Sequence, residues 1–280
     1  MNYTATGRVQ CIGRFSFVAP AAVNVTGRSQ SIYLTTVTTI PTPSGGMDAY
    51  WIKRLPGPGT RQPGEFALQA GLKSVWSARN PMFPNILTLE VVKPISGGLI
   101  VVESEAQIGN QSIAETLVKD IVNSYVPANN RGFCLGNGSI SLDPSQNEHV
   151  RLTMVDSSFP EIEIQFETQT VNEPDLRTYT NLDEERSLAS GRGGTLTVLR
   201  DQQRFAAGLS GKEIWISFVV SGDKPGLRFT WHYPGVGSSS TQPSINILGS
   251  APAEKKVQLA AIWETVLTSL SSVPLAAETK

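Results

Sequence analysis

The feature that most constrains the fold is a two-residue alternation of apolar and polar side chains along most of the chain. It is clearest in the segment EIEIQFETQTV, where Ile162, Ile164 and Phe166 alternate with glutamate and glutamine. Successive side chains of a β-strand point to opposite faces, so this alternation predicts a strand with one buried face. Residues 227–233, LRFTWHY, repeat the pattern and predict a second such strand.

Other segments extend the expected sheet. Residues 212–220, KEIWISFVV, are apolar on both faces, as is typical of a central strand covered on both sides. Earlier in the chain, alternating segments predict strands over 14–18, 31–39, 87–93 and 98–105. The sequence therefore indicates a protein built mainly from antiparallel sheet.

Two segments carry the helical period instead. In SIAETLVKDIVNSYV, Ser112 and Glu115 have the spacing of a capping box, and Pro127 is expected to end the helix. The face expected to be buried comprises Ile113, Leu117, Ile121 and Tyr125.

A second helix is predicted in PAEKKVQLAAIWETVLTSLSSV, where Pro252 suits a first helical turn. Its apolar stripe comprises Leu259, Ile262, Val266, Leu270 and Val273, with Trp263 beside it.

The two halves of the chain have the same order of parts. Each opens on a Cys-X-Gly segment, continues through alternating segments and closes on one amphipathic helix. A chain of 280 residues is long enough for two domains. The expected fold class is therefore α+β, with two sequential domains, each a mainly antiparallel β-sheet packed with an amphipathic helix. We expect domains 1–128 and 129–280, divided near the Pro-, Asn- and Gly-containing segment 126–132.

Charge and hydropathy exclude several partners. The chain has 23 basic and 24 acidic residues, and no basic stripe that would bind nucleic acid. No apolar segment reaches the length of a membrane span.

The start of the sequence lacks the apolar stretch of an export leader, so the protein is either cytosolic or an exported protein whose leader is missing from this sequence.

Motifs for catalysis and for metal binding are missing as well. The chain contains neither a Gly-X-Ser-X-Gly elbow nor a phosphate-binding loop. Its two histidines, His149 and His232, and its two cysteines do not have the spacing of a zinc site. We therefore expect no catalytic residue, no metal and no cofactor, although a cysteine and a histidine brought together only by the fold would escape this test.

One charged cluster has two readings. Asp183, Glu184, Glu185 and Arg186 follow one another in NLDEERSLAS. They form either a solvated short helix or loop, or a contact surface for a protein partner.

The second half resembles a known family in its sequence. The segments are RGFCLGNGSISL, EIEIQFETQT, RFAAGLSGKEIWISF, LRFTWHYPG and QPSINI, followed by the Trp-bearing helix. Together they resemble the C-terminal domain of immunity proteins that neutralise type VI secretion lipase effectors of family four. Within them, Gly208, Gly211 and Glu213 match the family's Gly, Gly and Glu pattern, and residues 11–15 resemble the opening of its N-terminal domain.

The resemblance implies a non-enzymatic periplasmic protein whose partner is a cognate phospholipase effector with an α/β-hydrolase fold. It implies that the two domains clamp the effector, so that its lid cannot open on membrane lipid. Protein interfaces depend on a few aromatic and arginine anchors, which makes Tyr50, Trp51 and Arg54 candidates together with the 183–186 cluster. For Trp51 the alternative is a core tryptophan at a strand edge.

Cys11 and Cys134 occupy matching places at the entrances of the two expected domains. Either they form one disulfide that ties the domains together, as the periplasm would permit, or each is a small buried apolar residue.

Two other functions remain open from the sequence. A periplasmic lipid- or glycan-binding module would need a concave apolar pocket and would retain a small molecule through purification. A hydrolase with an unrecognised site would act on esters by itself. An immunity protein would instead co-purify with a lipase and inhibit it.

Overall fold

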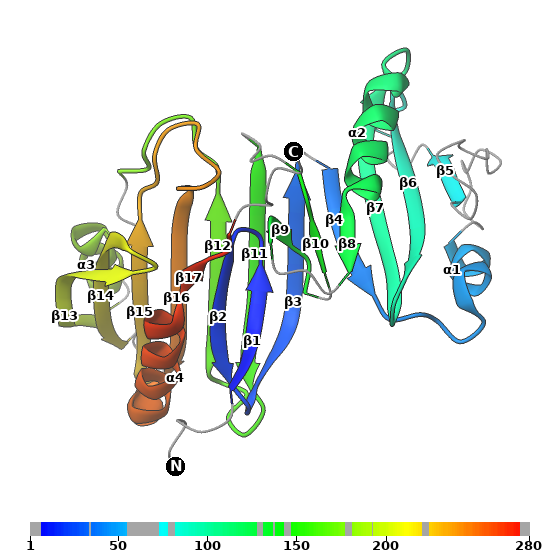
Figure 1. The fold of residues 1–280 in the computed structure, drawn as a ribbon. Helices are drawn as coiled ribbons and strands as arrows, with labels where there is room; N and C mark the ends of the chain where they lie inside the picture. The colour runs from blue at the N-terminus through cyan, green and yellow to red at the C-terminus, as the bar shows by residue number, and fades with distance from the viewer. Residues whose placement is uncertain are drawn as a thin grey trace. The chain divides into compact units, whose positions relative to one another are not determined.

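The structure, a computed structural model, describes residues 7–33, 35–54, 73–77, 82–127, 131–136, 138–142, 147–176, 181–191, 193–219 and 224–274. The chain divides into two compact units (Figure 1). Unit 1 comprises Met1–Arg28 and Gln146–Val273, and unit 2 comprises Ser29–Ser145 and Pro274–Lys280. The first 28 residues therefore group with the second half of the chain. The expected ranges 1–128 and 129–280 divide the chain differently, and they stay a prediction.

Unit 1 is built on an antiparallel sheet. Its strands are β3 (Val23–Ile32), β11 (Glu148–Asp156), β12 (Glu163–Gln169), β13 (Thr195–Ala206), β14 (Leu209–Val219), β15 (Gly226–Tyr233) and β16 (Ser244–Pro252). Their hydrogen-bonded order is β13-β14-β15-β16-β12-β11-β3, and the first part of β3 belongs to this unit. The expected alternation is confirmed in β12, because Ile162, Ile164 and Phe166 are buried while Glu163 and Gln165 are partly exposed.

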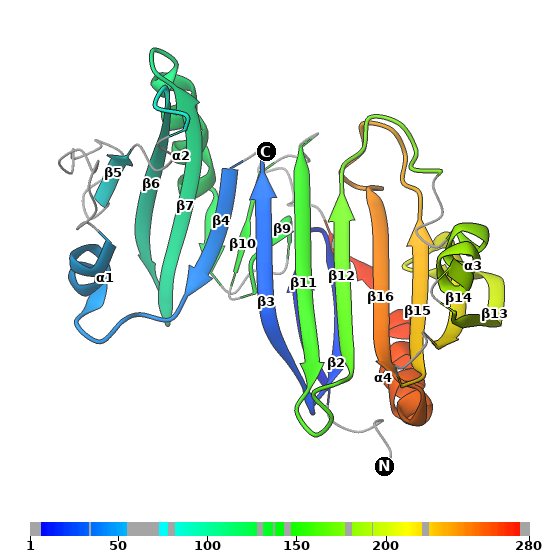
Figure 2. The same cartoon turned by 180° about the vertical axis from the view of Figure 1, so that it is seen from behind.

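A helix lies against each face of this sheet. Helix α4 (Lys256–Ser269) follows the short helix η1 (Ala253–Lys255) and covers one face (Figure 1). Helix α3 (Leu182–Gly191) lies against the other face (Figure 2). The expected stripe of the C-terminal helix is confirmed, since Leu259, Ile262 and Val266 are fully buried. Pro252, however, ends β16 and precedes the first helical turn.

A smaller sheet completes unit 1. It consists of β1 (Gly7–Ile12), β2 (Phe15–Pro20) and β17 (Ser271–Ser272), in the order β1-β2-β17. Phe17 packs against Phe166 of β12 with ring centroids 5.5 Å apart, and the Ser269 hydroxyl at the end of α4 accepts a 2.8 Å hydrogen bond from the Val18 amide. These contacts explain why the first residues of the chain fold with the second half.

Strand β14 lies between β13 and β15, and it is covered on both faces as expected. Trp215 stacks on Phe229 of β15 at 3.9 Å between ring centroids, and the Phe229 ring meets Trp263 of α4 edge-on. Ala207 and Gly208 connect β13 to β14 with positive φ angles of 51° and 75°. A two-residue hairpin with both φ angles positive matches the twist of the strands, which gives the Gly at 208 a physical reason.

Glycine is required at position 211 for a different reason, the close approach of a neighbouring ring. A Cβ atom at this position would lie 2.5 Å from Cε2 of Trp231, and that ring is fully buried with its Nε1 donating to the Arg204 carbonyl. Because the ring is held in place, we expect Gly211→Ala to lower the free energy of unfolding by about 1–3 kcal/mol. Denaturant unfolding followed by tryptophan fluorescence measures this. Gly191→Ala, whose Cβ meets nothing within 4 Å, is the matched control and should stay within about 0.5 kcal/mol; equal losses in both variants would refute the packing argument.

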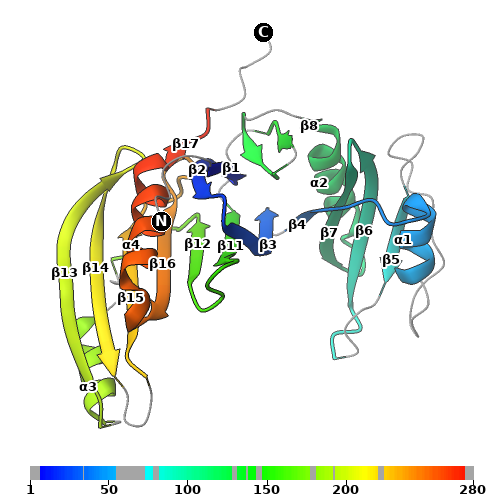
Figure 3. The same ribbon diagram turned by 90° about the horizontal axis from the view of Figure 1, so that it is seen from below.

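Unit 2 contains the remaining strands of the same 11-stranded antiparallel sheet, with a helix on each face of these strands, so the expected separate sheet for each domain is not found in the described residues. Its main strands are β4 (Thr35–Ile40), β5 (Lys73–Ser77), β6 (Ile86–Ile95) and β7 (Gly98–Gln107), in the order β4-β7-β6-β5 after the second part of β3. Helices α1 (Gly46–Arg54) and α2 (Gln111–Asn123) lie on opposite faces of these strands (Figure 3). A small sheet of β8 (Tyr125–Pro127), β10 (Gly138–Ile140) and β9 (Phe133–Cys134) follows α2.

The prediction for α2 is wrong in its start, its end and part of its buried face. The helix begins at Gln111 after Asn110, and Asn110 makes no side-chain capping bond. The predicted capping box of Ser112 and Glu115 therefore lies inside the helix. The helix ends at Asn123, and Pro127 instead ends strand β8. The buried residues are Ala114, Val118, Ile121 and Val122, whereas Ile113 is 68% exposed.

The predicted strand 31–39 is also wrong, because the chain turns within it. Strand β3 ends at Ile32 and β4 begins at Thr35, and the two strands pair antiparallel. Tyr33 in this turn has a φ of 51°, a conformation that non-glycine residues rarely adopt. The other early predictions correspond to β2, β6 and β7. The molecule is an α+β protein of mostly antiparallel sheet, as expected.

Candidate partner-binding site

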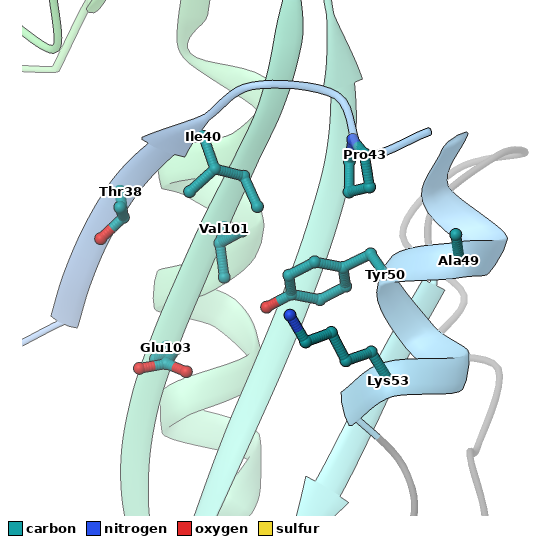
Figure 4. A pocket seen from close by; sticks show the side chains of 8 residues that line it. All are labelled: Thr38, Ile40, Pro43, Ala49, Tyr50, Lys53, Val101 and Glu103. Carbon is teal, nitrogen blue, oxygen red and sulfur yellow. The ribbon is translucent and has the colours of Figure 1, made fainter. Parts of the chain in front are cut away.

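A concave site in unit 2 contains Tyr50, one of the residues singled out from the sequence. We call it the Tyr50 pocket, a cavity of about 510 Å³ between α1 and the sheet (Figure 4). It is lined by Thr38, Ile40, Pro43, Ala49, Tyr50, Lys53, Val101 and Glu103. The pocket combines apolar walls with a phenol, an ammonium group, a hydroxyl and a carboxylate.

Strand register explains how these side chains meet. Thr38 of β4 pairs with Val101 of β7, and Glu103 of β7 pairs with Glu90 of β6. Residues two apart on a strand share a face, so Val101 and Glu103 both point toward α1. The Tyr50 hydroxyl donates to the fully buried Glu90 carboxylate, and this bond orients the phenol ring at the pocket wall.

Trp51 belongs to the core. It is 4% exposed and packs in a cluster with Val75, Val92, Leu99 and Val101. The alternative of a core tryptophan therefore describes its position, although it lies on a helix and not at a strand edge. Arg54 is the last residue of α1, and its side chain lies outside the described residues.

The charged cluster of the second half lies on α3, which has no buried residue. The Asn181 side chain accepts hydrogen bonds from the amides of Asp183 and Glu184, and three acidic residues in the first turn complement the helix dipole. Arg186 bonds Asp183 at 3.3 Å, and Asp183 is 94% exposed. Glu185 binds Arg228 of β15, so this residue holds the helix on the sheet.

Sequence reasoning did not predict the ion network around Glu213. This fully buried carboxylate accepts hydrogen bonds from Trp263 at 2.8 Å, Arg204 at 2.8 Å and Gln202 at 2.7 Å. Trp215 and Arg200 donate to it at 3.2 Å. Burial alone would raise the pKa of Glu213, but the bonds from Trp263, Arg204 and Gln202 outweigh it and hold the pKa below its usual value. The network joins β13, β14 and α4, and it explains the Glu of the Gly, Gly and Glu pattern.

A second ion network lies on the surface of β11 and β12. Glu167 lies 2.8 Å from His149 and 2.9 Å from Arg151. The hydrogen bond with His149 is the largest cause that lowers the pKa of Glu167 below its ordinary value of 4.5. A carboxylate with a lowered pKa contributes stability above that ordinary value, and the contribution is lost as the pH falls through the folded-state pKa.

We therefore expect Glu167→Gln to be less stable than the wild type at pH 6, by up to about 1 kcal/mol. The difference should shrink as the pH falls below 4.5. Thermal unfolding of both proteins from about pH 3 to about pH 6, where carboxylates titrate, measures this difference in stability. A difference that does not change with pH would refute this account of Glu167.

Both cysteines lie in buried positions, Cys11 on β1 and Cys134 on β9. Both are disulfide-bonded, and the described residues contain no free cysteine. The described residues also contain no group of three or more His, Cys, Asp or Glu side chains placed to hold a metal ion. Within the same residues, no helix is both long enough and apolar enough to cross a membrane.

Three solved structures share the whole fold. The apo immunity protein TplEi of the type VI secretion system from Pseudomonas aeruginosa matches with a TM-score of 0.76 and 15% identity, over 98% of this chain and 100% of that chain. The crystal structure of the Tle4–Tli4 complex contains a chain that matches at 0.77 and 16%, over 99% and 100%. TplEi bound to the "L" peptide matches at 0.71 and 17%, over 96% and 98%. No curated protein matches the chain in sequence.

The fold is thus that of the solved immunity proteins of the type VI secretion system. The family model of the Tle cognate immunity protein 4 C-terminal domain matches residues 126–271, which are more than half of the chain. The chain belongs to this Tle cognate immunity protein 4 family. The matched range contains Gly208, Gly211 and Glu213, whose structural roles are a hairpin turn, a close approach to Trp231 and the buried ion network.

Proposed function

We propose that this immunity protein binds a lipase effector of the Tle4 class and blocks its action on membrane lipid. The observation that carries the proposal is the family match over 126–271. The fold shared with the Tli4 chain of the Tle4–Tli4 complex supports it, because that chain is bound to an effector. A further support comes from this chain itself. The Tyr50 pocket is concave and combines apolar walls with polar groups, so it can hold a side chain of another protein.

Inhibition is proposed to work by holding the effector. The proposed effector is a lipase of α/β-hydrolase fold whose lid must open before lipid can enter its site. Each of the two units has its own set of strands and helices, so each can present a rigid surface to the effector. With both surfaces engaged, lid movement and substrate access are blocked. Hydrogen exchange of the effector tests this step, since its lid should become protected in the complex, and an unprotected lid would refute it.

The Tyr50 pocket is proposed as one contact. Its phenol, the Lys53 ammonium group and the Glu103 carboxylate can bind the polar end of an effector side chain, while Ile40 and Val101 pack against its stem. Arg54 at the end of the same helix is proposed to take part. The exposed Asp183, Glu184 and Arg186 of α3 form a second candidate contact.

We propose that the protein works in the periplasm, with Cys11 and Cys134 bonded to each other. The support is that both cysteines are disulfide-bonded and that the sequence contains two cysteines in all. Disulfides persist in oxidising compartments such as the periplasm. Cell fractionation of the native host tests the location, and protein found in the cytoplasmic fraction would contradict it.

Co-expression tests the binding itself. The tagged immunity protein is produced together with a Tle4-class lipase from the same bacterium. It should retain the lipase on an affinity column, with about one lipase for each immunity protein. A lipase from an unrelated family, which should pass through the column, is the control. Absence of the complex would refute the proposed function.

The alternative of a lipid- or glycan-binding module is favoured by one observation, the volume of the Tyr50 pocket. Native mass spectrometry of the isolated protein separates the two functions. A lipid or sugar that remains bound would favour the module, and an unliganded mass would favour the immunity protein.

A further inference from the structure

A second surface of unit 2 exposes apolar side chains on α2. Ile113 is 68% exposed and Tyr33 is 41% exposed, and partly buried Leu117 lies one helical turn after Ile113. These three side chains line two adjoining cavities, of about 530 and 370 Å³. We call this surface the α2 groove. Helix α2 therefore has two apolar faces, one against the sheet and one in the groove.

The backbone of the groove is strained at the residue that supplies its aromatic ring. Tyr33 has a φ of 51° in the turn between β3 and β4. A non-glycine residue in this region costs free energy, and such strain concentrates at functional sites. Glycine would fit the turn without strain. The tyrosine is therefore a costly choice for the fold, and its ring lines both cavities.

The charges around the groove indicate what it binds. Asp120 lines one cavity and Glu105 lines the other. Among the described residues, neither cavity is lined by lysine or arginine. An apolar centre with carboxylates at its rim is complementary to an apolar side chain that has a basic neighbour. Tyrosine is also among the residues that most often anchor a protein interface.

From these observations we infer that the α2 groove is a docking site for the effector, and that it receives a surface segment with one large apolar side chain next to a lysine or arginine. The inference rests on the proposed function and extends it to a contact separate from the Tyr50 pocket. The two sites lie on opposite faces of the unit 2 sheet, because α1 and α2 cover opposite faces (Figure 3).

The test measures the dissociation constant for the Tle4-class lipase by calorimetry. We expect Ile113→Glu to weaken binding at least tenfold, because it places a carboxylate in the apolar centre of the groove. We expect Tyr33→Gly to weaken binding at least tenfold as well, while its melting temperature stays at or above that of the wild type. The matched control is Val257→Glu, on α4 at a residue that is 78% exposed and lies in none of the proposed contacts; it should bind within twofold of the wild type.

The charged rim gives a second measurement. Asp120→Lys should weaken binding at least threefold and reduce its dependence on salt, whereas Glu254→Lys, at an exposed position in unit 1, should change neither.

The outcomes separate this inference from the proposed function. If the wild type does not bind the lipase, the proposed function fails and the docking site fails with it. If the wild type binds and Ile113→Glu loses less than tenfold, or Val257→Glu loses as much, only the docking site is refuted. Sedimentation of the protein alone tests whether a second copy of the chain, and not the effector, occupies the groove. Self-association that Ile113→Glu abolishes, with lipase binding unchanged, would also refute the effector as the occupant.

Discussion

Replacing Glu213 with alanine should lower the free energy of unfolding by about 3–5 kcal/mol. The carboxylate is fully buried and is the shared acceptor for the indole N–H groups of Trp215 and Trp263 and for the guanidinium of Arg204. Without it, two buried indole donors lose their partner, and each unsatisfied buried donor costs about 1–3 kcal/mol. The effect should be large because β13, β14 and α4 depend on this one side chain.

Glu264→Ala is the matched control, because Glu264 binds the same Arg204 at 2.7 Å but is 44% exposed. Water can replace an exposed carboxylate, so this variant should lose no more than about 1 kcal/mol. Denaturant unfolding of both variants, followed by tryptophan fluorescence, compares them. Equal losses would show that Glu213 is not the centre of the network.

The second large effect is expected at the cysteines. A disulfide between Cys11 and Cys134 closes a loop of about 120 residues, and in the chain-entropy model it disfavours the unfolded chain by about 4–5 kcal/mol. We expect the double variant Cys11→Ser, Cys134→Ser to lose a large part of this stability. Reductant should lower the wild type to the level of the double variant.

The control is the double variant itself, whose unfolding should not respond to reductant. Mass spectrometry without reductant tests the pairing directly, because the bonded wild type is lighter by two hydrogen atoms than the reduced protein. Two free thiols in the purified wild type would contradict the proposal.

The parts of the fold that could be predicted from the sequence are those with a strong local period. Strand β12 and the stripe of α4 follow it, and the burial of Ile164 and Leu259 agrees with expectation. The resemblance to the immunity family rested mainly on the same half of the chain, with residues 11–15 added from the first half. It depended on Gly208, Gly211 and Glu213, residues that a turn, a close packing contact and a buried network require.

Other parts could not be predicted, because their cause lies far away in the sequence. Helix α2 has two apolar faces, and the sequence pattern does not say which of them meets the sheet. The turn at Tyr33 contains a tyrosine with positive φ where a glycine or asparagine would have marked it. The grouping of the first 28 residues with the second half depends on contacts such as Phe17 with Phe166.

The candidate site was predictable in part. Tyr50 was chosen as an aromatic candidate anchor, and the structure places it at a pocket wall beside Lys53. Glu90 and Glu103 were missed, although a charged residue inside the apolar run LTLEVV was a usable signal. Such a residue is kept in a strand when a partner side chain satisfies it, and here Tyr50 does so.

The central claim is that this protein inhibits a lipase effector and catalyses nothing itself. The most direct measurement is the phospholipase activity of the Tle4-class effector on lipid vesicles, with increasing amounts of the purified immunity protein. The account predicts that activity falls linearly and disappears near one equivalent, while the immunity protein alone releases no fatty acid. Effector activity that stays unchanged with excess immunity protein, or ester hydrolysis by the immunity protein alone, would contradict it.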